Sequence, residues 1–245
     1  RPKDIQSGFF AGANDYVTKP VEALEIRSRI EALTTIKQTV REQLRLEAAW
    51  LQAQIQPHFL FNALSAVTAL SDINLDKMRH LLDEFSNFLR YKFRFQDTDG
   101  LVSIQEELSL VRSYLYIEKV RFEERLEVVW EVDDCEELKV PFLSIQPLVE
   151  NAIRHGIMKR TRGGEILIRI SVHDTLTEIT VQDNGIGMDE VQLQRILERT
   201  ADRNSGVGLI NTDQRLKRHF GTGLHIKSTL GEGTNITFYV RSGTN

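Results

Sequence analysis

The second half of the chain is organised around the stretch Leu176-Thr177-Glu178-Ile179-Thr180-Val181-Gln182-Asp183-Asn184-Gly185-Ile186-Gly187. Its first residues are mostly β-branched, as in a strand, and a glycine-rich turn follows them directly. A second run of strand type, 166–172, precedes it across a short turn at Asp174-Thr175. The stretch therefore predicts two strands joined by a turn, with a loop of small residues after the second strand.

The segments around these two strands alternate between strand and helix patterns. We predict further strands at 126–132, 224–228 and 235–240, and helices at 145–155 and 206–219. Ser103-Ile104-Gln105-Glu106 is a capping box that opens another helix. Over residues 99–245 this mixture predicts an α+β fold, an α/β sandwich in which helices cover one mixed sheet.

The first half of the chain carries helical patterns. Apolar residues recur at steps of three and four from Leu33 to Phe59, which predicts a long amphipathic helix with a linker over 34–56. After a polar turn at 71–74, a second stripe passes through Leu75, Met78, Leu82, Phe85 and Leu89. We therefore expect a helical hairpin over 57–98. Its apolar stripes need partners, so we expect a homodimer that forms a four-helix bundle.

Composition excludes several classes of partner. The 245 residues include 31 basic and 35 acidic side chains, a net charge of -4, so no overall field favours nucleic acid or an anionic membrane. The single cysteine, Cys135, excludes an intramolecular disulfide. No apolar run is long enough to span a bilayer. We expect a cytoplasmic protein with no membrane contact in these residues. A part of the protein ahead of Arg1 could hold a sensor or membrane anchor, and the sequence is silent on it.

One histidine stands out in the stretch Gln54-Ile55-Gln56-Pro57-His58-Phe59-Leu60-Phe61-Asn62. His58 lies one residue off the apolar stripe, in a row with Asn62 and Ser65, so its imidazole should reach solvent, as a nucleophilic histidine must. Pro57 removes a backbone donor, which predicts a bend beside the histidine. Position alone, however, favours a surface histidine without a role.

Three glycine clusters follow at Asp183–Gly187, Gly206–Leu209 and Gly231–Thr234. Each one alone fits an ordinary turn. Their order is more telling, because a loop after a strand, a Gly-x-Gly that opens a helix and a loop before the last strand could together hold phosphates. Glu150 and Asn151 precede them and offer oxygen ligands for a Mg²⁺ ion that enters with a nucleotide.

The stretch Pro147-Leu148-Val149-Glu150-Asn151-Ala152-Ile153-Arg154-His155-Gly156 resembles the N box of the ATP-binding domain shared by histidine kinases, Hsp90, MutL and type II topoisomerases. The glycine clusters resemble its G boxes. The resemblance implies that Asn151, with a weak contribution from Glu150, holds Mg²⁺, and that Asp183 accepts a hydrogen bond from the adenine amino group. The other nucleotide-binding residues that it implies are His155, Gly185, Gly187, Gly206, Gly208 and Thr234.

The run Gln56–Asn62 is similar to the histidine motif of LytS-type sensor kinases of two-component systems. This resemblance implies an ATP-dependent protein histidine kinase in which His58 accepts the phosphoryl group and passes it to an aspartate of a response-regulator receiver domain. Asn62 would orient the imidazole. Pro147 stands four residues before Asn151, where water-splitting relatives carry a glutamate, so water activation is not expected. Phe59 replaces the acidic base of many histidine kinases, as in LytS-type kinases.

Residues 9–20, which end in Lys19-Pro20, resemble the last strand of a receiver domain, and we predict that 1–33 are the remnant of such a domain. We expect 188–205 to form a lid over the nucleotide, whose arginines 195, 199 and 203 either hold phosphates or form a solvated face. Two alternatives remain for the whole chain. One is a regulatory relative that binds ATP to switch conformation, and the other is a scaffold in which the hairpin only dimerises.

Overall fold

The computed structural model describes residues 20, 22–35, 37, 57–94, 100–197 and 207–241, apart from the side chains of 195, 197 and 207. The chain divides into two compact units, Arg1–Leu60 and Phe61–Asn245. The strand predicted before Lys19 and most of the linker helix lie outside the described residues. None of the helices in the described ranges has the length and apolar character that a bilayer crossing requires.

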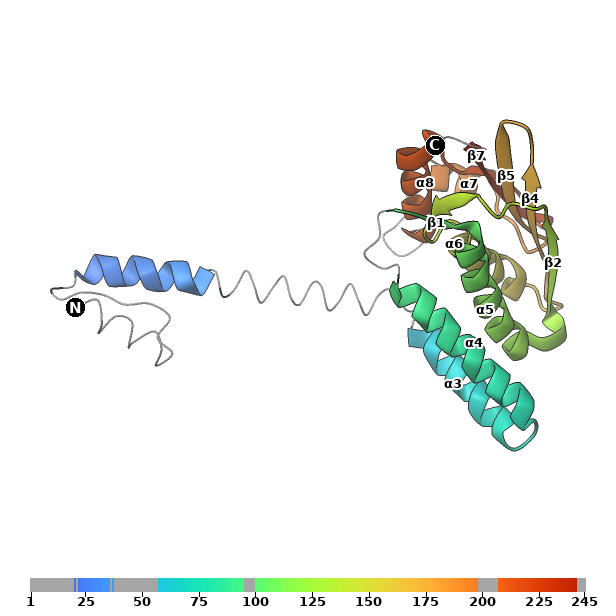
Figure 1. Cartoon of the computed structure of the whole chain (residues 1–245), viewed down its shortest axis with the longest axis horizontal. Helices are drawn as coiled ribbons and strands as arrows, with labels where there is room; N and C mark the ends of the chain where they lie inside the picture. Colours follow the sequence, from blue (N-terminus) through green and yellow to red (C-terminus); the bar gives the residue numbers. More distant parts are fainter. Residues whose placement is uncertain are drawn as a thin grey trace. The chain divides into compact units, whose positions relative to one another are not determined.

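The predicted helical hairpin is present as α3 (Pro57–Ser71) and α4 (Leu75–Arg94). Figure 1 shows the two helices running antiparallel on either side of their short turn. Asn74 ends the turn, and its side-chain oxygen accepts the backbone N–H of Lys77 at 2.9 Å. This bond satisfies one of the N–H groups that a helix start leaves without a partner, so Asn74 acts as the N-cap of α4.

The face of α4 that is buried within this chain differs from the predicted stripe. Leu81 and Phe88 are the buried residues of α4, whereas Leu75 and Leu82 are exposed. The reason is that α4 packs against the following helix, where the ring centroids of Phe88 and Tyr114 lie 6.0 Å apart. Leu81 and Phe88 are seven residues apart, so they lie on one face of α4, beside the predicted stripe.

A two-stranded ribbon and a long helix connect the hairpin to the main sheet. Strands β1 (Leu101–Ser103) and β3 (Lys139–Pro141) pair antiparallel, and α5 (Ile104–Phe122) begins directly after β1. The predicted capping box is confirmed: Ser103 Oγ accepts the N–H of Gln105 at 3.2 Å, and Glu106 accepts the N–H of Ser103 at 3.3 Å. The sequence had not indicated the ribbon.

The main sheet has the strand order β2-β4-β5-β7-β6. Strand β2 (Leu126–Val132) runs parallel to β4 (Gly164–Val172), and the remaining neighbours are antiparallel. These remaining strands are β5 (Leu176–Asp183), β7 (Gly233–Arg241) and β6 (His225–Thr229). Every strand that was predicted within 99–245 is therefore present, and the sheet is mixed as predicted.

Helices cover one face of this sheet. Residues such as Ile168, Ile179 and Phe238 point to that face and are fully buried. They lie beneath α5, α8 (Val207–Phe220) and the turn Ala152–Gly156 that continues α6 (Gln146–Asn151). In Figure 1 α5 lies between α4 and the sheet. The α+β sandwich is thus confirmed.

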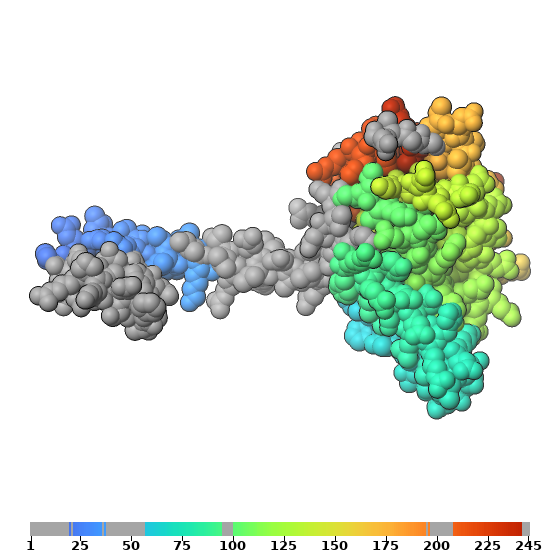
Figure 2. All heavy atoms as spheres, in the orientation of Figure 1, coloured from blue at the N-terminus to red at the C-terminus, as the bar shows by residue number. Residues whose placement is uncertain are grey.

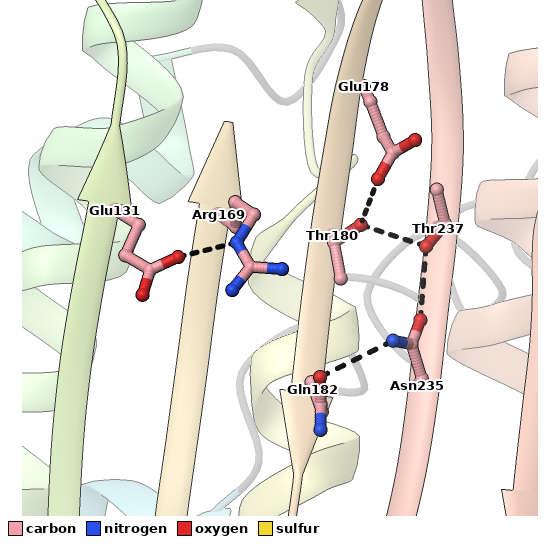
Figure 3. A network of polar contacts seen from close by, with 7 residues as sticks. All are labelled: Glu131, Arg169, Glu178, Thr180, Gln182, Asn235 and Thr237. Carbon is pink, nitrogen blue, oxygen red and sulfur yellow. Dashed lines mark hydrogen bonds and ion pairs between the residues drawn. The ribbon is translucent and has the colours of Figure 1, made fainter. Parts of the chain in front are cut away.

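The other face of the sheet is polar. Figure 3 shows Arg169 paired with Glu131 across β2 and β4, and Thr180 within 2.8 Å of the Thr237 hydroxyl across β5 and β7. Cross-strand polar pairs of this kind each contribute roughly 0.2–1 kcal/mol relative to a pair of alanines. The apolar core therefore lies on the helix side of the sheet.

Candidate functional site

Asp183 is the centre of the site. It ends β5, is only 4% exposed, and its Oδ1 accepts the N–H of Gly185 at 2.8 Å. Burial raises the pKa of Asp183 to about 6, although hydrogen bonds from the N–H groups of Gly185 and Thr234 lower it. A carboxylate has about four acceptor positions, so these two amides leave capacity for a further donor.

Glycines make room for this carboxylate. A Cβ at Gly156 would lie 2.4 Å from Asp183 Oδ1, and a Cβ at Gly185 would lie 2.3 Å from the carbonyl carbon of Gly156. At Gly187 the backbone has a φ of 62°, and a Cβ there would lie 1.9 Å from the carbonyl oxygen of Thr229. Such approaches exclude every larger residue. The end of the N-box segment and the first glycine loop therefore meet at Asp183.

The third glycine loop is joined to the first one. Thr234 is buried, and its hydroxyl lies 2.9 Å from that of Ser228 on β6. Ser228 Oγ also accepts the N–H of Met188 at 2.9 Å, immediately after the first loop. Ser228 was not identified from the sequence, because a serine in a strand gives no local signal. Ser228 therefore connects the first and third glycine loops.

The predicted N-box helix is present, but only its first part is α-helical. Helix α6 ends at Asn151, and a π-helical turn, Ala152–Gly156, follows it. Such a turn is frequent at functional sites, because it re-aims the side chains that it carries. Asn151 is half-buried at the junction. On the π-turn, desolvation lowers the pKa of His155, helped by the positive charges of Arg154 and Lys159.

Both carboxylate oxygens of Glu150 have side-chain partners four residues away in the sequence. One of its oxygens accepts the side-chain amide of Gln146 at 3.2 Å, and the other lies 3.4 Å from Arg154. In the described part of the chain, no group of three or more His, Cys, Asp or Glu side chains could hold a metal ion. A Mg²⁺ ion here would take most of its oxygen ligands from phosphates and water, with Asn151 as the protein's ligand. The residues present fit that arrangement.

Helix α8 begins beside the start of α6. Gly208 lies in its first turn, where an added Cβ would lie 3.6 Å from Cβ of Pro147. Helix α8 has 14 residues, and the N–H groups of its first turn are suited to bind phosphate. Gly206 lies outside the described residues. So do arginines 199 and 203 and the side chain of Arg195, while the predicted lid contains a helix, α7 (Glu190–Leu197).

A buried glutamate that no motif includes caps the N-box helix. Glu107 on α5 is fully buried, and its carboxylate accepts the N–H groups of Leu143, Ile145 and Gln146 at 2.9, 2.8 and 3.1 Å. Helix α6 has no side-chain cap of its own. Burial raises the pKa of Glu107, whereas the three N–H groups lower it. Glu107 therefore stabilises the start of α6 from 38 residues upstream of Ile145.

The hairpin reaches this same segment through Lys92. Its Nζ on α4 donates to Gln146 Oε1 at 3.4 Å. Burial lowers the pKa of Lys92, while the charges of Glu150 and Glu107 raise it. In Figure 2 the atoms of α4 adjoin those of α5 on the face in view. Gln146 in turn donates to Glu150, the residue before Asn151, so these hydrogen bonds connect α4 to the N-box helix.

His58 is exposed in the first turn of α3, and Asn62 is half-buried one turn further on. His58 belongs to the unit Arg1–Leu60, whereas Asn62 and the nucleotide-site residues belong to Phe61–Asn245. The structure thus brings together Asp183, Gly185, Gly187, Thr234 and the N box, with Gly208 beside Pro147. Helix α3 begins at Pro57. The predicted bend involves residues before Pro57, outside the described ranges.

Comparisons with known proteins fit this geometry. A histidine kinase family model matches residues 46–126, and a model for the histidine kinase-, DNA gyrase B- and HSP90-like ATPase matches residues 141–244. The putative uncharacterized protein YwpD of Bacillus subtilis is 41% identical over 97% of this chain and 85% of its own length.

Two named sensor proteins are also similar. Sensor histidine kinase YpdA of Escherichia coli is 37% identical over 84% of this chain and 37% of its own length. Sensor protein LytS of Bacillus cereus is 38% identical over 78% of this chain and 33% of its own length. The chain thus spans roughly a third of the length of these two sensor proteins, although it spans most of YwpD.

Proposed function

We propose that this chain, which belongs to the LytS-type histidine kinases and is a protein histidine kinase, uses ATP with Mg²⁺ to phosphorylate its own His58. It then passes the phosphoryl group to an aspartate of a response-regulator receiver domain. In this proposal 57–98 form the dimerisation and phosphotransfer hairpin, and 99–245 the ATP-binding domain. Residues 34–56 link the hairpin to a receiver remnant at 1–33.

The observation that carries the proposal is the buried Asp183 carboxylate at the end of β5. It lies where only glycines allow close approach, and its pKa is raised to about 6 by burial. Keeping such a group buried is unfavourable without a ligand, so it is typical of a binding site. An ionised Asp183 would accept the amino group of adenine, with Thr234 and the glycine loops around the base.

The remaining residues have roles at the phosphates. The N–H groups in the first turn of α8, near Gly208, would bind phosphate oxygens. Asn151 would hold Mg²⁺, which neutralises charge on the phosphates when it is bound. A ring nitrogen of exposed His58 would then form a bond to the γ-phosphorus while the bond to the β–γ bridging oxygen breaks. ADP leaves with that electron pair, and the imidazole releases its proton. Asn62 would orient the ring.

A second copy of the chain would complete the hairpin. On α3, Phe61 and Leu64 are 69% and 49% exposed, and on α4 Leu75 is 54% exposed. Exposed large apolar side chains on both helices of the hairpin favour burial against another helix pair. We therefore propose a homodimer with a four-helix bundle. The response regulator would bind near His58, on the cytoplasmic side if the full protein is anchored in a membrane.

The test is incubation with γ-labelled ATP and Mg²⁺, followed by acid and alkali treatment. Label that is acid-labile and alkali-stable is phosphohistidine. It should be lost in His58→Gln and kept in the matched control His173→Gln, whose side chain is exposed in the β4–β5 turn. Added receiver domain should take the label from the kinase, and a receiver without its acceptor aspartate should not.

Other outcomes would assign the alternatives. Equal labelling of wild type and His58→Gln would exclude His58 as the acceptor. ATP binding without labelling would favour the regulatory relative, and no ATP binding would favour the scaffold. Asn62→Ala should keep nucleotide affinity but slow labelling, because its proposed role concerns the orientation of the imidazole alone.

A further inference from the structure

The peptide at Leu143, just before the N-box helix, has an unusual backbone. Leu143 has a φ of 61°, one of two positive values among the described non-glycine residues. For a leucine this left-handed conformation is unfavourable, and it persists only where the surroundings enforce it. The segment therefore depends on contacts made by other parts of the fold.

Side chains from two helices hold this peptide on both sides. On one side its N–H donates to Glu107 Oε2 of α5 at 2.9 Å. On the other side its carbonyl oxygen accepts Nη2 of Arg215 at 2.8 Å and the hydroxyl of Thr212 at 3.3 Å, both from α8. Charged partners make the strongest of these bonds. We call Glu107, Thr212, Arg215 and the Leu143 peptide the Leu143 clamp.

The clamp shares one face of α8 with the phosphate site. Gly208, Thr212 and Arg215 are spaced by four and three residues, so they lie in one row along the helix. Gly208 lies against Pro147 in α6, and the other two bond to Leu143. The whole row therefore rests on residues 143–147, the entry to the helix that carries Asn151.

We propose that the Leu143 clamp sets the position of α6 relative to α8, and thereby lets Asn151 and the N-terminal turn of α8 engage the same nucleotide. Glu107, Thr212 and Arg215 are positioning residues, since none of them belongs to the proposed nucleotide contacts. This inference rests on the proposed nucleotide site but not on the proposed role of His58. Asp183 and the adenine side of the pocket do not depend on the clamp.

This division gives the clamp a specific signature. The part of the affinity for ADP that requires Mg²⁺ should depend on the clamp, because this part requires the correct position of α6 relative to α8. The affinity in the presence of EDTA, which reports the base side, should not. A residue with a merely structural role would change both affinities together.

The experiment measures ADP binding to the full chain by calorimetry, with Mg²⁺ and with EDTA. Arg215→Met removes the charged donor and keeps an apolar stem, and Thr212→Val removes the hydroxyl at nearly constant volume. We expect Arg215→Met to reduce the Mg²⁺-dependent gain in affinity roughly tenfold and Thr212→Val about threefold. The matched control Arg218→Met, at an exposed position on the same helix, should match wild type.

Several outcomes would overturn the clamp. One is that both variants keep the wild-type gain in ADP affinity on addition of Mg²⁺. Another is that the variants lose ADP affinity equally with Mg²⁺ and with EDTA. The third is that the wild type does not bind ADP. If Arg215→Met does not fold, as judged by circular dichroism, Thr212→Val decides. Failure of the proposed function is seen separately, because absence of label on His58 leaves these binding measurements unchanged.

Discussion

Asp183→Asn should make the protein more stable at neutral pH while it removes nucleotide binding. Burial moves the pKa of Asp183 from 3.8 in an exposed side chain to about 6. A shift of about two units corresponds to roughly 3 kcal/mol of the free energy of unfolding. Asparagine bonds the two N–H groups less strongly, which offsets about 1 kcal/mol. We therefore expect a net gain of about 2 kcal/mol.

The sign follows from proton binding. Because the folded state binds a proton on Asp183 more tightly than the unfolded state does, this group destabilises the fold progressively as pH rises from about 4 to about 6. Above that range the destabilisation is complete. The advantage of the variant should therefore be nearly absent at pH 4 and fully present at pH 7.5.

The assay is urea denaturation of wild type and Asp183→Asn at several pH values, together with ADP calorimetry at pH 7.5. Asp174→Asn, at an exposed turn, is the control for loss of one negative charge. The reasoning is refuted if Asp183→Asn is no more stable than wild type at pH 7.5, or if the two stabilities run parallel across pH. Tight ADP binding by the variant would refute the role of Asp183 in adenine binding.

Two further substitutions test the surroundings of the site. Gly156→Ala should weaken ADP binding at least tenfold in calorimetry, because its Cβ would lie 2.4 Å from Asp183 Oδ1. The control is Gly221→Ala, where an added Cβ meets nothing within 4 Å. This control should keep the affinity for ADP and lose only about 1 kcal/mol of stability. Lys92→Met should leave stability within about 1 kcal/mol in urea denaturation but slow labelling of His58 severalfold, and Lys92→Arg should restore the rate. An unchanged rate in Lys92→Met would show that the contact with Gln146 does not support phosphoryl transfer.

The elements that the sequence predicted well carry their signal within a few residues. The strand at 126–132 and the capping box at Ser103 depend on neighbours along the chain, and both are present. The glycine loops were visible because glycine adopts positive φ without strain and allows close backbone approach. Asp183 was visible because it directly precedes such a loop. The signal for the hairpin turn at 71–74 likewise lies within those few residues.

Other features depend on contacts between distant segments. Nothing beside Glu107 in the sequence indicates that it caps a helix 38 residues away, since a glutamate in a helix is ordinarily solvated. The buried face of α4 was missed because α5 covers it. Leu143 has no residue type that favours positive φ, so only the surrounding bonds to Glu107 and Arg215 maintain its conformation.

The sequence by itself determined the α+β class, the order of the helices and strands and the identity of the glycine loops, because these follow from local periodicity and backbone freedom. Only the tertiary structure decided how the N-box helix is held in place. Buried polar groups must find partners wherever the fold places them, and the partners of Leu143 come from α5 and α8, 36 and 72 residues away.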